Sequence, residues 1–228
     1  MTGIKANIDL IRQEIACSAL KSGRKPQDIT LVAVTKTIPV GIIEEALQAG
    51  IDQIGENRVQ EALQKYPFIT NRAAWHLIGH LQTNKVKHVV PLFQLIHSVD
   101  RPELAEEVAR QASKRGVVAR VLIQVNVARE ATKYGLDPLE TPDFAGYLAH
   151  LPGLKVEGLM TIAPYVEDPE EVRPVFRELR RQAQHIKACN IPGIGMDVLS
   201  MGMTGDFKVA IEEGSTLVRV GTGIFGIR

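Results

Sequence analysis

The feature that most constrains the fold is an alternation between short apolar, β-branched runs and segments with helical periodicity. Runs of this length and composition are typical of β-strands. Eight of them predict strands at residues 31–35, 52–55, 75–79, 94–99, 119–125, 156–162, 196–201 and 217–220. Most lack in/out alternation, which suits strands packed between outer helices and a barrel interior. Eight strand–helix units in 228 residues therefore predict an α/β protein with a single (β/α)₈ TIM barrel. An open doubly wound sheet, which usually has fewer strands, is the alternative.

The helical segments carry signals of their own. An extra helix ahead of the first strand is predicted from four isoleucines at helical spacing, Ile4, Ile8, Ile11 and Ile15. Asp100 with Glu103 predicts a capping box at the start of the helix after the fourth strand. Gly214 predicts the end of a helix at residues 207–213.

Composition excludes several classes of protein. The chain has 27 Lys and Arg against 26 Asp and Glu, a net charge of +1 without a basic block, which argues against a nucleic-acid binder. It has no apolar run long enough for a membrane span, and charged residues near the start argue against a signal peptide. Two cysteines do not make a disulfide framework. We expect one cytoplasmic domain over residues 1–228, monomeric, with no membrane partner.

In a barrel of this kind the active site lies at the carboxyl ends of the strands. The first predicted strand is followed by Lys36, which shares a strand face with Val32 and Val34. If that face is the barrel interior, burial would lower the pKa of the Lys36 amine and make it a nucleophile toward aldehydes. A lysine that extends to water at a strand end is the alternative.

The last two strands end in segments rich in glycine and hydroxyl groups. Residues 199–206 (LSMGMTGD) and 221–226 (GTGIFG) lie where barrels often bind a phosphate. The second segment matches G-x-G-x-x-G, but no further βαβ unit follows it, so we reject a dinucleotide site. Two ordinary turns are the alternative. Within the second segment's strand, Arg219 needs a partner, because an unpaired buried charge is costly.

A lysine amine and a phosphate site on neighbouring strands imply a phosphorylated aldehyde or ketone. Pyridoxal 5′-phosphate and a phosphosugar both fit. His76 and His80 resemble a metal pair, but four residues along a strand span roughly 13 Å, so no metal site is predicted. His80 is expected near the barrel mouth as polar lining, and His76 is expected to be structural.

Several segments together resemble the pyridoxal phosphate homeostasis protein family. They are residues 75–85 (WHLIGHLQTNK), 199–204 (LSMGMT) followed by Asp206 and Phe207, 218–226 (VRVGTGIFG), 34–36 (VTK) and 54–57 (IGEN). The likeness runs over nearly the whole chain in order. It implies a fold-type III barrel, like the N-terminal domain of alanine racemase, that binds pyridoxal 5′-phosphate.

The resemblance implies cofactor contacts at Lys36, Asn57, His80, Met160, Ser200, Met201, Gly202, Arg219, Gly221 and Thr222. Lys36 would form the Schiff base, the internal aldimine. Ser200, the backbone around Gly202, and Gly221 with Thr222 would hold the phosphate. Asn57 and Met160 would line the ring, and Arg219 would face its pyridine nitrogen. Because arginine only donates hydrogen bonds, that nitrogen would stay unprotonated and the ring would be a weak electron sink.

Alanine racemase adds a second base on a C-terminal β-domain, for which this sequence has no residues after Arg228. We therefore expect little turnover and a role in vitamin B6 and amino-acid/keto-acid homeostasis. Amino acids and apo-enzymes that use the cofactor are possible partners. One alternative is an amino-acid racemase with Lys36 as base and Tyr66, Tyr165 or His80 opposing it. A Schiff-base aldolase acting on a phosphosugar and a protein-interaction role regulated by the cofactor are the others.

Overall fold

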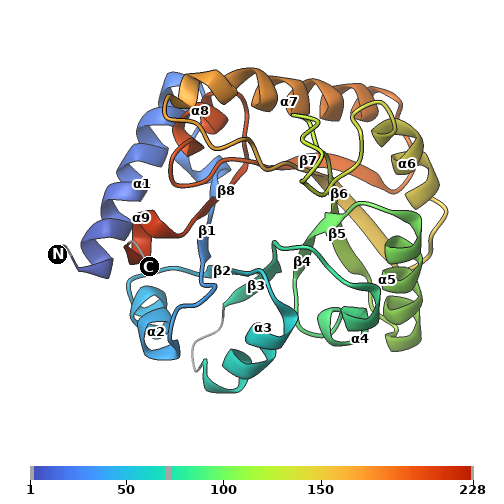
Figure 1. The fold of residues 1–228 in the computed structure, drawn as a ribbon, viewed down its shortest axis with the longest axis horizontal. Helices are drawn as coiled ribbons and strands as arrows, with labels where there is room; N and C mark the ends of the chain where they lie inside the picture. The colour runs from blue at the N-terminus through green and yellow to red at the C-terminus, as the bar shows by residue number, and fades with distance from the viewer. Residues whose placement is uncertain (1–2, 70–72, 227–228) are drawn as a thin grey trace.

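The computed structural model describes residues 3–69 and 73–226, and its centre is a closed barrel of eight parallel strands in chain order. Parallel pairing of the first strand with the last, Thr30 opposite Leu217 to Ala33 opposite Val220, closes the barrel. Helices surround it on the outside (Figure 1). The predicted (β/α)₈ architecture is confirmed, and the open sheet is excluded.

Each predicted run overlaps one strand, and the observed bounds differ from the predicted ones by at most two residues. The strands are β1 Thr30–Val34, β2 Gln53–Glu56, β3 Ala74–Leu77, β4 Leu95–Val99, β5 Ala119–Gln124, β6 Leu154–Met160, β7 Ile194–Ser200 and β8 Leu217–Val220. Strand ends shift because pairing with neighbours, rather than the apolar run itself, decides where a ladder stops.

The helices are α1 Ile4–Lys21, α2 Val40–Gln48, α3 Val59–Lys65, α4 Val86–Val89, α5 Pro102–Arg115, α6 Thr141–Leu148, α7 Arg173–Ala188, α8 Phe207–Glu212 and α9 Thr222–Phe225. Short 3₁₀ turns lie at Pro26–Asp28, Tyr66–Phe68, Thr83–Lys85 and Pro169–Val172. Gly214 follows α8 with a φ of 103°, as expected for a glycine that ends a helix.

The predicted capping box at Asp100 is wrong. Helix α5 begins at Pro102, its N-cap is Arg101, and no side chain caps it. The Asp100 carboxylate instead accepts a hydrogen bond from Arg101 at 2.7 Å. Proline at the first helical position sets the start of the helix through its fixed φ, and this moves the cap one residue beyond Asp100.

The extra N-terminal helix is confirmed. Ile8, Ile11 and Ile15 of α1 are buried, and the helix lies beside α8 and α9 on the outside of the barrel (Figure 1). Asn7 of α1 donates a hydrogen bond to the carbonyl of Ile224 in α9 at 2.9 Å. The first helix therefore packs against the end of the described chain.

The core has two parts. The larger lies between strands and helices, and the smaller fills the barrel interior with Val32, Leu95, Leu122, Met160 and Leu217. Because successive side chains on a strand alternate between faces, the residues two positions beyond Leu95, Leu122 and Leu217 also point inward. They are His97, Gln124 and Arg219, which place polar groups above the apolar interior.

Among the helices of the described residues, none combines the length and apolar character that a bilayer span requires.

Candidate functional site

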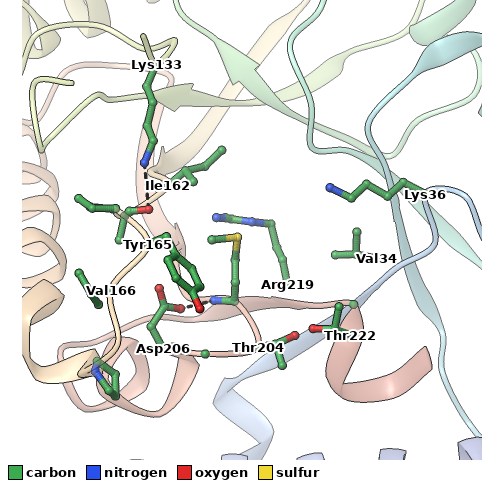
Figure 2. Close-up of a pocket in the computed structure, with 16 residues that line it drawn as sticks. Val34, Lys36, Lys133, Ile162, Tyr165, Val166, Thr204, Asp206, Arg219 and Thr222 are labelled. Carbon is green, nitrogen blue, oxygen red and sulfur yellow. Dashed lines mark hydrogen bonds between the residues drawn. The ribbon is translucent and has the colours of Figure 1, made fainter. Parts of the chain in front are cut away.

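A cavity of about 460 Å³ lies where β1, β6, β7 and β8 end, with Lys133 from the segment after β5 at its edge. Figure 2 shows Lys36, Arg219, Thr204 and Thr222 around it. Its volume is in the range of small-molecule pockets, and its place at the carboxyl ends of the strands is the usual active-site position in this fold.

Lys36 lies in the turn after β1, and its side chain points into the cavity toward Arg219 (Figure 2). The residue is exposed, which agrees with the alternative of a lysine that extends to water at the strand end. Strand β1 ends at Val34, which is buried, so Lys36 extends beyond the apolar floor. Burial therefore gives no account of the reactivity of its amine.

The backbone on both sides of Lys36 is fixed by a charged cluster behind the turn. The ammonium of Lys65 donates to the carbonyl of Thr35 at 2.6 Å and to carboxylate oxygens of Glu56 and Glu61, each at 2.7 Å. Glu61 also accepts from the backbone N–H of Thr37. Thr37 has a φ of 63°, a conformation that is strained for a β-branched residue. The cluster thus stabilises a turn that presents Lys36 to the cavity.

Glu56 is fully buried, and burial raises the pKa of its carboxyl group. One of its oxygens accepts from Lys65 and from the hydroxyl of Thr35, while the other has no hydrogen-bond partner among the described residues. Burial thus favours the neutral form of Glu56, while its contacts with Lys65 and Thr35 act in the opposite direction.

Arg219 is only 4% exposed and reaches the cavity from β8. Its guanidinium donates to the carbonyls of Ser200 and Thr161, each at 2.8 Å, and to the hydroxyl of Ser200. Burial lowers its pKa to about 10, while the charge of Asp206 acts in the opposite direction. Arg219 therefore keeps its proton at neutral pH and only donates hydrogen bonds.

Asp206, behind Arg219, is also buried, and burial raises the pKa of its carboxyl group. Its carboxylate accepts from the backbone N–H of Met203. This contact shapes the turn after β7 that carries Thr204 into the cavity (Figure 2).

The two segments predicted to bind a phosphate meet at one side of the cavity. Gly221, Thr222 and Thr204 line it, and the side chains of Thr204 and Thr222 point toward each other (Figure 2). The N–H of Gly223 donates to the Thr204 hydroxyl at 3.3 Å, and a Cβ at Gly223 would lie 3.1 Å from the Thr204 methyl group. Glycine therefore allows the close approach of the two turns.

Ser200, Met201 and Gly202 do not line this cavity. Ser200 and Met201 are fully buried, and the hydroxyl of Ser200 accepts a hydrogen bond from Arg219. Gly202 has a φ of 96°, and a Cβ there would lie 2.7 Å from that of Ala210 on α8. Their contacts with a cofactor stay predictions, and the structure gives each of them a packing role.

Asn57 and His80 line a neighbouring cavity of about 530 Å³ together with Tyr134. The ring of His80 stacks on that of Tyr134 with centroids 3.9 Å apart. Met160 is buried in the barrel interior. The structure thus brings Lys36, Arg219, Gly221 and Thr222 into one cavity and places the other six candidates around it.

Sequence reasoning singled out Thr204 only as part of the predicted phosphate segment 199–206, and it missed Lys133. Lys133 lies in a long segment between β5 and α6 and donates to the carbonyl of Ala163 at 3.1 Å. No strand end or motif marks it.

Comparison with known proteins gives consistent matches. A family model described as "Alanine racemase, N-terminal domain" matches residues 4–228. A pyridoxal phosphate homeostasis protein from Aquifex aeolicus is 46% identical over 220 residues, which cover 96% of this chain and 95% of that protein.

Solved structures agree with this. PipY of Synechococcus elongatus, with pyridoxal phosphate bound, is 36% identical at a TM-score of 0.82, covering 95% of this chain and all of that one. An alanine racemase from Clostridium difficile is 15% identical at a TM-score of 0.77, covering 99% of this chain and 57% of that one. The latter similarity shows the fold alone.

Proposed function

Because the chain belongs to the pyridoxal phosphate homeostasis protein family, whose members share the fold of the alanine racemase N-terminal domain, we propose that it binds pyridoxal 5′-phosphate. The binding site is the cavity at the carboxyl end of the barrel. Its role is vitamin B6 and amino-acid/keto-acid homeostasis inside the cell, with little or no turnover.

One observation carries the proposal: a single cavity holds the amine of Lys36, the guanidinium of Arg219 and the hydroxyls of Thr204 and Thr222. Each part of the cofactor has a matching chemical group. A primary amine reacts with an aldehyde. Hydroxyl donors on glycine-flanked turns suit a phosphate. The donor set therefore matches the chemical groups of the cofactor.

When bound to a lysine amine, this cofactor supplies an electron-withdrawing ring. In this chain Lys36 would hold the cofactor, and Thr204 with Gly221 and Thr222 would orient its phosphate. Arg219 would donate a hydrogen bond to the ring nitrogen. Since Arg219 retains its proton at neutral pH, the nitrogen would accept that bond without becoming protonated, and carbanion chemistry at the ring would be damped.

The candidates for a second base support low turnover. Tyr66 packs edge-on against Trp75, with ring centroids 5.6 Å apart, and His80 belongs to the neighbouring cavity. Tyr165 lines the cavity but is 96% exposed.

An amino-acid racemase is the second candidate function, because Tyr165 and Lys36 line the same cavity. Incubation with amino acids in deuterium oxide tests it. Deuterium uptake at the α-carbon at catalytic rates, lost in both Lys36→Ala and Tyr165→Phe, would establish the racemase. Slow exchange that survives Tyr165→Phe would fit reversible exchange of amino acids with Lys36 alone.

The test of the proposal is an absorption spectrum before and after borohydride reduction, followed by peptide mass mapping. We expect a yellow protein in which reduction attaches the cofactor to the Lys36 peptide, and a colourless Lys36→Ala variant. Lys133→Ala is the matched control, because Lys133 is a second lysine of the same cavity. Attachment to Lys133 instead would reassign the anchoring lysine. A protein that stays colourless with added cofactor would reject the proposal and favour a phosphosugar barrel.

The proposal also names partners: amino acids as second ligands and apo-enzymes as recipients of the cofactor. It further includes a monomeric state and a cytoplasmic location. Size-exclusion chromatography with and without an apo-enzyme tests the oligomeric state and the partner together.

A further inference from the structure

A row of buried polar side chains crosses the barrel interior from Arg219 to the opposite end. The hydroxyl of Ser200 on β7 accepts from Arg219 and lies 3.0 Å from Nδ1 of His97 on β4. Nε2 of His97 lies 2.9 Å from Nδ1 of His76 on β3. Nε2 of His76 lies 2.8 Å from Oε1 of Gln53 on β2. Five side chains from five strands thus form one unbroken hydrogen-bonded row.

The burial of this row makes its contacts costly to break. His97 and Ser200 are fully buried, and His76 and Arg219 are 4% exposed. Every ring nitrogen of both histidines has a partner in the row. A buried polar group without a hydrogen bond is strongly destabilising, so each member constrains the next.

Only one proton arrangement satisfies all contacts when the histidines are neutral and Gln53 presents its carboxamide oxygen to His76. Because that oxygen can only accept, His76 carries its proton on Nε2 and donates to Gln53. Nδ1 of His76 then accepts, so His97 carries its proton on Nε2 and donates to it. Nδ1 of His97 in turn accepts from the O–H of Ser200, whose oxygen accepts from Arg219. Every bond runs in the same direction, away from the cavity.

The surroundings of His76 and His97 favour the neutral form of both rings. Burial lowers the pKa of His76 to about 4, and Arg120 acts in the same direction. Burial also lowers the pKa of His97 well below its ordinary value, with further contributions from His76 and Arg219. Both rings are therefore uncharged at neutral pH, as the single arrangement requires.

We propose that His97 is a positioning residue for the proposed cofactor site: through the Ser200 hydroxyl it fixes the guanidinium of Arg219 in the cavity, and His76 with Gln53 holds His97 in the required tautomer. This inference rests on the proposed function, because Arg219 is the group that would meet the cofactor ring. If His97 carried its proton on Nδ1, two donors would face the Ser200 oxygen and the Ser200 O–H would lose its acceptor.

The first test needs no cofactor. Long-range ¹H–¹⁵N NMR of the imidazole rings at pH 7 reports the tautomer of each histidine. We expect both His97 and His76 to be neutral with the proton on Nε2. A proton on Nδ1 of His97, or a charged ring at either position, would overturn the proposal whether or not the protein binds pyridoxal phosphate.

The second test is a double-variant cycle read out as the dissociation constant for pyridoxal phosphate. His97→Leu removes the acceptor for Ser200, and we expect about tenfold weaker binding, the size of one lost hydrogen bond. If His97 acts through Ser200, then His97→Leu combined with Ser200→Ala binds no more weakly than Ser200→Ala alone. Additive losses would instead show that His97 acts by another route and would overturn the proposal.

Two further variants separate positioning from loss of packing. His97→Gln keeps an acceptor for Ser200 and a donor for His76, so we expect it to retain most of the wild-type affinity. Leu122→Ala removes an apolar side chain from the same interior, on β5, which carries no member of the row. It should lower the free energy of unfolding and leave the affinity unchanged.

The outcomes distinguish the two proposals. A wild-type protein that does not bind pyridoxal phosphate rejects the proposed function, while the NMR test of the row still stands. A wild-type protein that binds, with a His97→Leu variant of equal affinity, rejects the positioning role alone. If His97→Leu does not fold, the NMR test of the wild-type protein decides: a proton on Nδ1 of His97 would reject the role of His97.

Discussion

At the scale of single residues, the turn that presents Lys36 depends on a side chain that never reaches the cavity. Lys65 contacts a backbone carbonyl on one side of Lys36 and, through Glu61, a backbone N–H on the other. It also neutralises part of the charge on the buried Glu56. The ammonium of Lys65 thus stabilises the conformation of the turn and also pairs with the carboxylate of Glu56.

Lys65→Met should therefore be strongly destabilising. Breaking a buried pair by removing one partner costs about 3 kcal/mol or more, because the remaining charge is left without compensation. Chemical denaturation measures the loss. Lys5→Met is the control, because Lys5 forms an exposed pair with Asp9 and should change stability by less than about 0.5 kcal/mol. Equal effects of both substitutions would contradict the role of Lys65.

Residues that follow strands were predictable, while those that depend on tertiary neighbours were not. Lys36, Arg219, Gly221 and Thr222 were found because the fold places strand ends around one mouth. The contact between His97 and His76 joins β4 to β3, and nothing in their spacing along the chain marks it. Whether Lys36 is buried or extends to water was left open by the sequence, since one residue beyond a strand end decides whether a side chain has an apolar floor.

At the scale of elements, apolar periodicity was the most informative signal. Four isoleucines identified α1, whose buried face packs against the outside of the barrel. Polar capping patterns were less informative. The Asp100 carboxylate binds the neighbouring Arg101, and Pro102 sets the start of the helix, so Asp100 does not cap it. Helix faces are specified by several residues together, but a cap depends on one.

Ile8→Ala tests how much this helix contributes. Ile8 is fully buried, so the substitution should lower the free energy of unfolding by about 3 kcal/mol through lost burial and the cavity left behind. Leu10→Ala on the exposed face of the same helix is the control; its side chain is 55% exposed, and we expect a change within about 0.5 kcal/mol. Denaturant titrations of both variants make the comparison. A small effect at Ile8 would mean that the packing of α1 on the barrel contributes little to the free energy of unfolding.

At the scale of the whole molecule, the buried histidines make stability depend on pH. His76 titrates near pH 4 in the folded state and near 6.5 when unfolded. Between these values the unfolded chain binds a proton that the folded protein does not, so stability falls as pH drops from about 6.5 to about 4. The difference between the folded and unfolded pKa values of His76 corresponds to about 3 kcal/mol of the free energy of unfolding.

Denaturant titrations at pH 7, 5.5 and 4.5 measure this slope. His76→Gln should flatten it, whatever the absolute stability of the variant. His150→Gln, at an exposed histidine near the end of α6, should leave it unchanged. A His76→Gln variant with the wild-type slope would show that other groups carry the acid sensitivity.

The contact between α1 and α9 also sets a condition on synthesis at the ribosome. The hydrogen-bonded residues Asn7 and Ile224 are 217 positions apart in the chain. At a translation rate of roughly 5–20 residues per second, roughly 10–40 s pass between the synthesis of α1 and that of α9. Throughout that time α1 can contact the early elements α2 and Pro26–Asp28, but its contacts with α8 and α9 cannot form. Part of the apolar face of α1 therefore stays uncovered until the last helices have been made.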